Sequence, residues 1–467
     1  MRPNETKLNV RAYYFAFAVL SAIALLAPIR AGDLPGYDDA LYSDIAREIV
    51  TSGDWLNLRI NGLRYLQHGP LLEWMQAVLF SIFGPSDPMA KLPSALCGLG
   101  AILLVGWLGR RLTGNPLIGL LATFVLATSA YFVKYSAHAM TDVPVTFFFL
   151  AAICAWSLKD EDPRWYLASG VFTAFALMTR ELAGCALPVI FGIHLLIERR
   201  RPPVGYAVAS LAIAIIPLAA WYARAIHLYG AWVFAGTSVW MDQAVAGALS
   251  PAWRRYTGIF EYAWMLAKSY WPWLPFTIAG TAALMRRRDP RLLLLIVWPA
   301  VVALVCAAVS SRVLRYMLPA YPAFSILAAI GLVRVVPLGY IRSGLRVLTP
   351  LLATAVIAIA VFPPEVHHAA EIRPVAVAAA SVTPPNGRIV FYDAGPPRYD
   401  ETNQILWYSG RNVLMMFSPD ELGQAMRERP TLVFVVDSDT YRKYFDSRTA
   451  DVIVAQSGHL MCVRLAP

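Results

Sequence analysis

Seven carboxylates gather in the segment that follows the first apolar run of the chain, although only 15% of the 467 residues are charged. They are Asp33, Asp38, Asp39, Asp44, Glu48, Asp54 and Glu73. A carboxylate can take the proton of a hydroxyl or an amine while that group attacks a carbon atom, which is general-base catalysis. Ionisable groups beside a membrane are costly, so we expect them to serve chemistry on a lipid-borne substrate.

The elements that must position these groups are membrane helices. The chain is 58% hydrophobic and has a mean hydropathy of +0.52, which leaves too little charge to cover a water-soluble surface. Apolar runs near the ~20 residues that cross a bilayer predict about eleven transmembrane helices. The runs centre on 12–29, 92–109, 115–131, 141–158, 165–179, 182–197, 204–226, 268–285, 291–309, 315–333 and 345–362. We interpret the first run as a membrane helix and not a signal peptide, because no small-residue cleavage site follows it.

Basic residues predict the orientation of these helices. They cluster at alternate connections, which the positive-inside rule assigns to the cytoplasm. The clusters are Arg110/Arg111, Lys159/Arg164, Arg199–Arg201, Arg286–Arg288 and Arg342/Arg346. With the N-terminus in the cytoplasm and an odd number of spans, the C-terminus is expected outside. The formal charge of +10 therefore reflects topology and not nucleic-acid binding.

The acidic segment is predicted to form two interfacial helices joined by turns. Leu41, Ile45 and Ile49 recur at helical spacing with charged residues opposite, which indicates an amphipathic helix. A second helix is expected to begin near Pro70, because proline suits a first turn. We therefore expect residues 1–362 to form a transmembrane domain whose catalytic loop is 30–90.

Residues 363–467 have a different character. Short β-like runs alternate with polar segments, and Ser418 to Glu421 has a capping-box pattern. The runs are 388–392, 432–436, 452–455 and 460–463. We expect a small α/β domain outside the membrane, with a structural or acceptor-docking role because it has no cluster of catalytic residue types. The five cysteines are scattered over spans and tail, so no disulfide framework is predicted.

The connection 228–266 is rich in aromatic residues, among them Trp232, Trp240 and Trp264. Such a stretch is typical of an aromatic belt at a membrane surface. It is equally compatible with a mobile cover over a substrate cavity.

The order of motifs in the acidic segment resembles that of one family. Asp-Asp-x-x-Tyr is followed by Ala-Arg-Glu, Gly-Asp-Trp, Asn-Gly-x-x-Tyr and Pro-Leu-x-x-Trp. These motifs begin at Asp38, Ala46, Gly53, Asn61 and Pro70. In combination they resemble the GT-C glycosyltransferases of the protein O-mannosyltransferase and aminoarabinose-transferase superfamily. The resemblance extends to Met140–Pro144, Met178–Glu181 and Arg315–Pro322.

The resemblance implies an all-α polytopic membrane protein that moves a sugar from a polyprenyl phosphate to an acceptor. Asp38 matches the family's base, and capping of the interfacial helix is its alternative role. Asp142 would orient the acceptor or stabilise charge at the sugar ring, with packing as its alternative. Arginines would bind the departing phosphate. The residues implied in substrate binding are Asp39, Tyr42, Tyr65, His68, Arg180, Arg315 and Tyr316, with Lys134 and Arg312 as weaker phosphate-binding candidates.

The chain departs from the family pattern just before Pro70. Relatives carry an acidic residue and a lysine there, whereas this chain has Gln67 and His68. His68 would replace the lysine as a phosphate-binding or titrating group. Gln67 is a poor metal ligand, so we expect no obligatory metal where some relatives hold zinc. His138 and His227 are isolated in the sequence and are expected to be loop or packing residues.

The predicted function is that of a bacterial inner-membrane glycosyltransferase that acts on the periplasmic face. Its acceptor would be lipid A, lipopolysaccharide core, another glycan or a protein, and the sequence selects neither the acceptor nor the sugar. The alternative is a lipid-linked sugar transporter or flippase, which would need charged or broken helices near the bilayer midplane. Charge here clusters at the outer ends of the predicted spans, which favours the enzyme.

Overall fold

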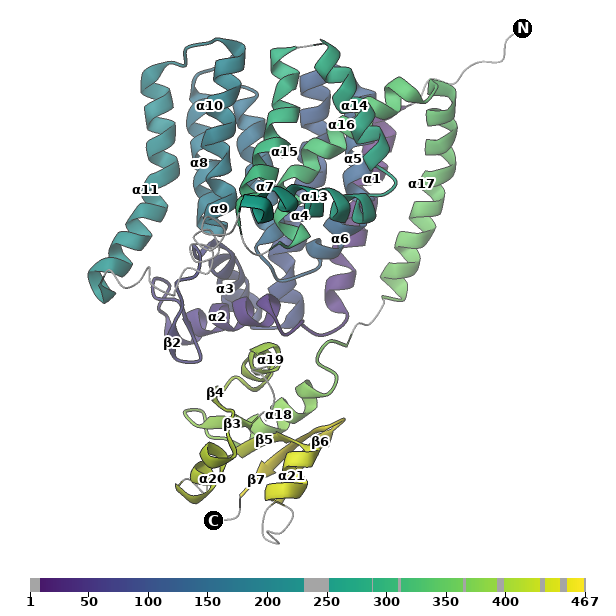
Figure 1. The fold of residues 1–467 in the computed structure, drawn as a ribbon. Helices are drawn as coiled ribbons and strands as arrows, with labels where there is room; N and C mark the ends of the chain where they lie inside the picture. Colours follow the sequence, from purple (N-terminus) through teal and green to yellow (C-terminus); the bar gives the residue numbers. More distant parts are fainter. Residues whose placement is uncertain are drawn as a thin grey trace. The chain divides into compact units, whose positions relative to one another are not determined.

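The structure is a computed structural model that describes residues 9–230, 252–287, 289–309, 312–363, 367–392, 399–428, 433–445 and 452–465. Trp232 and Trp240 of the predicted aromatic connection lie outside these ranges. Contacts divide the chain into two units (Figure 1). The membrane unit comprises Met1–Ile29, Leu66–Leu72 and Leu92–Pro363, and the α/β unit comprises Arg30–Tyr65, Glu73–Lys91 and Pro364–Pro467.

Helices account for every predicted span of the membrane unit. Within the described ranges, seven helical stretches are long and apolar enough to cross a bilayer, and the bent pair α5 and α6 makes an eighth. The remaining predicted spans correspond to α7, α8 and α14, which are 14 to 16 residues long. The helices are α1 (Val10–Leu26), α4 (Asp87–Thr113, which begins in the α/β unit), α5 (Pro116–Ala127), α6 (Ala130–Ser136), α7 (Asp142–Trp156), α8 (Arg164–Thr179), α9 (Glu181–Gly184), α10 (Ala186–Glu198), α11 (Val204–Tyr229), α13 (Ala252–Ser269), α14 (Leu274–Arg287), α15 (Pro290–Ala308), η3 (Leu314–Ala320), α16 (Tyr321–Val335) and α17 (Leu338–Val361). The predicted all-α membrane part is confirmed.

Local sequence explains where several of these helices begin and how closely they pack. Asn115 accepts a hydrogen bond from the amide of Leu117 at 2.9 Å, so an asparagine cap followed by proline starts α5. Helices α14 and α16 approach so closely that a β-carbon on Gly280 would collide with the Leu327 carbonyl. Small residues at such crossings let helix backbones meet, which is how helices associate where no hydrophobic effect drives them.

The C-terminal part of the α/β unit is a layered sheet domain. Its described strands are β3 (Arg388–Tyr392), β4 (Asn412–Met416), β5 (Val433–Asp437), β6 (Val452–Ser457) and β7 (Leu460–Arg464), in the order β4-β3-β5-β7-β6. Strand β3 is parallel to β4 and β5, whereas β7 is antiparallel to β5 and β6. The four predicted strands and the predicted α/β class are confirmed, and β4 was not predicted.

Helices cover both faces of this sheet. Side chains alternate along β3, so that Ile389 and Phe391 pack with α18 (Ile372–Val382) and α19 (Tyr399–Ser409). Val390 and Tyr392 pack on the opposite face with α20 (Pro419–Glu428), and α21 (Ser438–Tyr444) follows β5. The predicted capping box is confirmed, because the Ser418 hydroxyl accepts from the Glu421 amide at 3.2 Å and Glu421 accepts from the Ser418 amide at 3.2 Å.

The acidic segment belongs largely to the α/β unit. It contains α2 (Asp38–Ser52), the antiparallel pair β1 (Arg59–Ile60) and β2 (Leu63–Arg64), and most of α3 (Leu71–Phe83). Both predicted helices of this segment are present. The sequence assigned residues 30–90 to the transmembrane domain, whereas in the structure Arg30–Tyr65 and Glu73–Lys91 group with Pro364–Pro467, and only Leu66–Leu72 group with the membrane unit. The physical reason is a set of polar contacts with α18, α19 and β4 that no hydropathy pattern reveals.

Candidate active site

Three charged residues predicted from sequence come together in the membrane unit. Asp142 is the first residue of α7 and is only 2% exposed. The Arg180 guanidinium donates to its Oδ1 at 2.9 Å, and Nε of Arg315 lies 3.8 Å from its Oδ2. Arg180 lies between α8 and α9, and Arg315 lies on η3. Residues separated by up to 173 positions in the numbering thus meet at one carboxylate.

The cluster brings two guanidinium groups to one carboxylate. The ring of Tyr316 lies beside both, with its centroid 4.4 Å from the Arg180 guanidinium carbon and 5.9 Å from that of Arg315. Arginine stacks on aromatic faces, and its planar fork of N–H groups matches the geometry of a planar anion. Such a cluster can bind phosphate oxygens and stabilise the charge that develops when a phosphate departs.

Contacts from neighbouring helices hold the elements of this cluster in place. Ser94 on α4 donates to the Met140 carbonyl at 3.0 Å, just before α7 begins. Trp298 on α15 donates to the Pro319 carbonyl at 2.9 Å, and the Cys306 thiol donates to the Tyr316 carbonyl at 3.3 Å. These bonds fix both ends of η3, and therefore the backbone from which Arg315 and Tyr316 extend.

His68 lies in the short segment of the membrane unit that precedes α3. It is 8% exposed, and its Nδ1 lies 2.8 Å from the Gly69 carbonyl oxygen. Burial, with a smaller contribution from the charge of Arg180, lowers the pKa of His68 to about 4, although the hydrogen bond with the Gly69 carbonyl opposes this shift. Because a carbonyl only accepts, neutral His68 carries its proton on Nδ1 and offers Nε2 as an acceptor. His68 therefore cannot supply the fixed positive charge of the family's lysine, although it can accept from a hydroxyl.

The remaining predicted site residues lie in the α/β unit around the start of α2. Asp38 and Asp39 form the first turn of this helix, where the helix dipole favours carboxylates. The N-cap residue is Tyr37, whose side chain makes no capping hydrogen bond, so Asp38 is the first helical residue and does not occupy the N-cap position. Tyr42 and Tyr65 are buried. Burial raises the pKa of Tyr65 well above its usual range, and the neighbouring Tyr42, Glu73 and Asp38 add to the effect, so Tyr65 keeps its proton.

The other sequence candidates have local explanations. Arg312 is paired with Glu261 and lies 3.4 Å from the Thr257 hydroxyl. Lys134 lies 5.6 Å from the ring centroid of Tyr135 on α6. Sequence reasoning did not single out Glu181, which is buried and accepts from the Tyr222 hydroxyl at 3.1 Å, although it directly follows Arg180. Within the described ranges, no three His, Cys, Asp or Glu side chains gather closely enough to hold a metal ion.

Sequence comparison connects the chain to lipid-linked sugar transferases. The family model described as dolichyl-phosphate-mannose-protein mannosyltransferase matches residues 67–222. The undecaprenyl phosphate-alpha-4-amino-4-deoxy-L-arabinose arabinosyl transferase of Shewanella sediminis is 25% identical over 347 residues, which are 71% of this chain and 61% of the relative. The protein of the same name from Edwardsiella ictaluri is 28% identical over 196 residues, 41% and 36% of the two chains. The matches thus span less than two thirds of these relatives.

Structure comparison gives a match over nearly the whole chain. ArnT from Cupriavidus metallidurans in its apo state aligns with a TM-score of 0.78 and 16% identity, over 97% of this chain and 98% of ArnT. ArnT bound to undecaprenyl phosphate aligns with a TM-score of 0.71 and 18% identity, over 97% of each chain.

Fold and sequence together define the class. The chain is a multi-pass membrane protein with the fold of ArnT, including the C-terminal α/β domain. Its sequence is similar to those of the aminoarabinose transferases and to the family model of the protein mannosyltransferases.

Proposed function

We propose that this protein is a glycosyltransferase that moves a sugar from a polyprenyl phosphate to an acceptor of the cell envelope. The observation that carries the proposal is the meeting of Arg180 and Arg315 on buried Asp142, because a pair of guanidinium groups is the kind of site that binds phosphate oxygens. The relatives support the donor class, since they are named for undecaprenyl phosphate-linked aminoarabinose and one solved structure holds undecaprenyl phosphate. Lipid A, lipopolysaccharide core, another glycan and protein remain the acceptors to test.

The reaction is a substitution at the anomeric carbon of the sugar. The acceptor oxygen or nitrogen forms the new bond to that carbon while the bond from carbon to the phosphate oxygen breaks. The electron pair of the broken bond stays on the phosphate, where Arg180 and Arg315 stabilise it. Asp38 takes the proton of the acceptor, and the loss of a general base typically costs ~10²–10⁴ in rate.

The other residues have supporting roles in this proposal. Asp142 orients the two arginines and balances part of their charge when no phosphate is bound. Tyr316 holds the guanidinium planes by stacking. Asp39, Tyr42 and Tyr65 shape the start of α2, where Tyr65 remains a hydrogen-bond donor because it stays protonated. His68 accepts a hydroxyl hydrogen bond through Nε2.

No step of this mechanism uses a metal ion, and we propose that none is obligatory. The support is chemical, because Gln67 offers an amide where relatives of the family have a carboxylate. Transfer measured after treatment with EDTA should equal transfer before it. Loss of activity with EDTA that returns with Zn²⁺ or Mg²⁺ would contradict the proposal.

We further propose that the protein lies in the inner membrane with its N-terminus in the cytoplasm and the C-terminal domain in the periplasm. The support is the alternation of basic connections. In a variant without Cys185, an impermeant thiol reagent added to whole cells with a permeabilised outer membrane should label a cysteine placed at Asp439. The same reagent should not label a cysteine at Arg287. The reverse pattern would overturn the topology.

The enzyme and the transporter are separated by turnover. In the membrane unit, Asp142 begins α7 and Arg180 follows α8, so this charge lies at helix ends and not at helix centres. Purified protein in lipid nanodiscs should transfer sugar from undecaprenyl phosphate-aminoarabinose, or from another undecaprenyl phosphate sugar, to one of the acceptor classes. Mass spectrometry of the acceptor would identify both substrates. Movement of the donor across a membrane without sugar transfer would favour the flippase.

A further inference from the structure

The backbone that leads into Asp38 is held by a helix of the C-terminal domain. Gln404 on α19 is 3% exposed, and its amide donates to the Leu34 carbonyl at 2.9 Å and to the His368 carbonyl at 3.1 Å. The Leu34 amide donates to the Tyr408 hydroxyl at 2.8 Å, and Asn403 donates to the Tyr37 carbonyl at 3.3 Å. Three side chains of one helix thus bind Leu34 and Tyr37, the first and the last of the four residues that precede the predicted base.

The contact is also sterically close. A β-carbon on Gly36 would collide with the carbonyl oxygen of Asp400, which lies in the first turn of α19. Glycine is therefore required where the loop backbone passes the helix. Helix α2 depends on this backbone, because the Ala40 amide donates to the Pro35 carbonyl at 3.2 Å and the Leu41 amide donates to the Tyr37 carbonyl at 3.3 Å.

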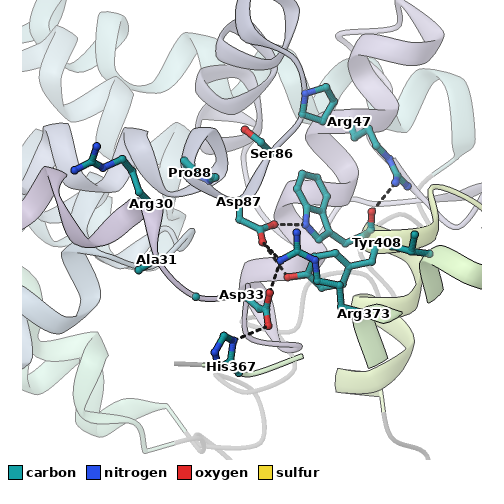
Figure 2. Close-up of a pocket in the computed structure, with 14 residues that line it drawn as sticks. Arg30, Ala31, Asp33, Arg47, Ser86, Asp87, Pro88, His367, Arg373 and Tyr408 are labelled. Atoms are coloured by element: carbon teal, nitrogen blue, oxygen red, sulfur yellow. Dashed lines mark hydrogen bonds and ion pairs between the residues drawn. The ribbon is translucent and has the colours of Figure 1, made fainter. Parts of the chain in front are cut away.

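A charged network holds the chain at Asp33, the residue that directly precedes this segment (Figure 2). Figure 2 shows Asp33 and Asp87 turned toward Arg373 of α18, with distances of 2.6 Å and 3.9 Å from Nη1 to the two carboxylates. Asp87 also accepts from the Trp407 indole at 2.7 Å and from the Tyr408 hydroxyl at 3.2 Å. These groups line a cavity of about 570 Å³. Asp33 is 5% exposed, so its charge is paired where water reaches poorly.

A third attachment lies beyond α2, at the turn between β1 and β2. Asn61 donates from Nδ2 to the Val413 carbonyl at 2.7 Å, and the Val413 amide donates to Asn61 Oδ1 at 2.8 Å. The asparagine side chain therefore pairs with strand β4 as another strand would. Arg47 on α2 completes the set by donating to the Trp407 carbonyl at 2.9 Å. The start, the body and the far end of the α2 region are each bound to the C-terminal domain.

We infer that helix α19 positions Asp38, with Gln404, Asn403 and Tyr408 as its positioning residues. This inference rests on the proposed function, because it assigns the C-terminal domain to the catalytic step and not to acceptor docking. The domain holds the carboxylate in place before the acceptor arrives. A displacement of about 1 Å at a reacting group can cost 10²-fold in rate.

The test uses two variants of the full-length protein that loosen the contact from opposite sides. Gln404→Met keeps the size of the side chain but removes both hydrogen bonds, and Gly36→Ala forces the loop backbone away from Asp400. The matched controls are Gln424→Met and Gly423→Ala on α20, where Gln424 is exposed and a β-carbon on Gly423 would meet only the Arg427 side chain, at 3.5 Å. Two readouts are measured on folded protein: transfer kinetics and hydrogen exchange of the amides of residues 34–41.

We expect both test variants to lower kcat by about 10-fold to 100-fold, with the donor KM changed less than about 3-fold. Exchange at Ala40 and Leu41 should accelerate, and the controls should match the wild type in both readouts. Unchanged kcat in a variant whose exchange accelerates would overturn the inference, as would unchanged exchange in both variants. If the wild-type protein transfers no sugar, the proposed function fails, and the exchange readout still decides whether α19 holds the start of α2.

Discussion

The two carboxylate regions of this protein are built in opposite ways. Asp142 lies in the membrane unit at the start of one helix, and two arginines from neighbouring helix ends pair with it directly. Asp38 lies in the α/β unit, and the polar contacts that fix its approach come from a domain more than 300 residues later in the chain. Charge balance defines the first region, whereas backbone attachment defines the second.

The difference teaches which kind of substitution each region should tolerate. A buried ion pair loses most when one partner is removed, because the other charge stays uncompensated. A backbone held by hydrogen bonds loses position and not charge, so its defects should appear in rate before they appear in stability. Kinetic and stability measurements should therefore separate the two regions.

The largest effect is expected at the predicted base. Asp38→Asn keeps the shape of the side chain but cannot take the acceptor's proton, so transfer should fall by ~10²–10⁴. The thermal midpoint should change little. Asp39→Asn, in the same helical turn, should be milder because Asp39 only supports the loop. Near-wild-type turnover in Asp38→Asn would remove the base from the mechanism.

Asp142 should respond in the opposite way, with a large loss of stability. Asp142→Asn removes the buried carboxylate that pairs with Arg180 and Arg315, and breaking a buried pair costs about 3–5 kcal/mol. The thermal midpoint in detergent should fall, and Asp142→Asn combined with Arg180→Gln should recover part of it. Asp439→Asn is the control, because Asp439 is 93% exposed in its pair with Arg442 and should have little effect. Equal midpoints for Asp142→Asn and Asp439→Asn would contradict the comparison.

The phosphate-binding role is tested by Arg315. Arg315→Met should lower kcat/KM by about 10²-fold, because one fixed cation at the departing phosphate is lost. Arg315→Lys should be intermediate, since lysine keeps the charge but loses the planar fork. Arg312→Met offers a nearby control, because Arg312 is already paired with Glu261. A larger loss in Arg312→Met than in Arg315→Met would transfer the role to Arg312.

The smallest effect is expected at His68 and concerns pH. Its folded pKa of about 4 lies below the ordinary 6.5, so between these values the unfolded chain binds more protons. Above pH 6.5 the buried His68 therefore does not reduce the free energy of unfolding. As pH falls from 6.5 toward 4 it reduces this free energy progressively, by about 2 kcal/mol at pH 5. The stability difference between wild type and His68→Gln should change by this amount between pH 7.5 and 5. Transfer kinetics should show no His68-dependent change between pH 6 and 7.5, and such a change would contradict the burial argument.

Much of the membrane unit could be predicted from the sequence because hydrophobic length and basic connections are local signals. The motifs at Asp142, Arg180 and Arg315 could be recognised for the same reason, since each is a short run of residues. The distances between these motifs depend on how the helices pack. The family resemblance implied that the motifs meet, but their spacing along the sequence did not predict it. Strand β4 was missed because Asn412 and three of its four following residues, Leu414, Met415 and Met416, do not favour strands strongly.

The attachment of the acidic segment to the C-terminal domain could not be predicted from the sequence. It depends on single polar residues such as Gln404 and Asn61, whose partners are backbone atoms that any sequence would provide. The neutral state of His68 was equally hidden, because neither Gln67 nor Gly69 indicates burial. Hydrogen bonds between distant segments leave no periodicity in the chain, so only the folded arrangement reveals them.

The distance along the chain between Leu34 and Tyr408 also constrains how the protein is made. The two residues are 374 positions apart, and Asp33 and Arg373 are 340 positions apart. During synthesis, the acidic segment leaves the ribosome long before its partners exist. The loop must remain incompletely folded while every later span is inserted. The N-terminal region can thus complete its folding only after the last hundred residues have been synthesised. A chain whose synthesis stops before them would be inserted in the membrane with its first loop incompletely folded.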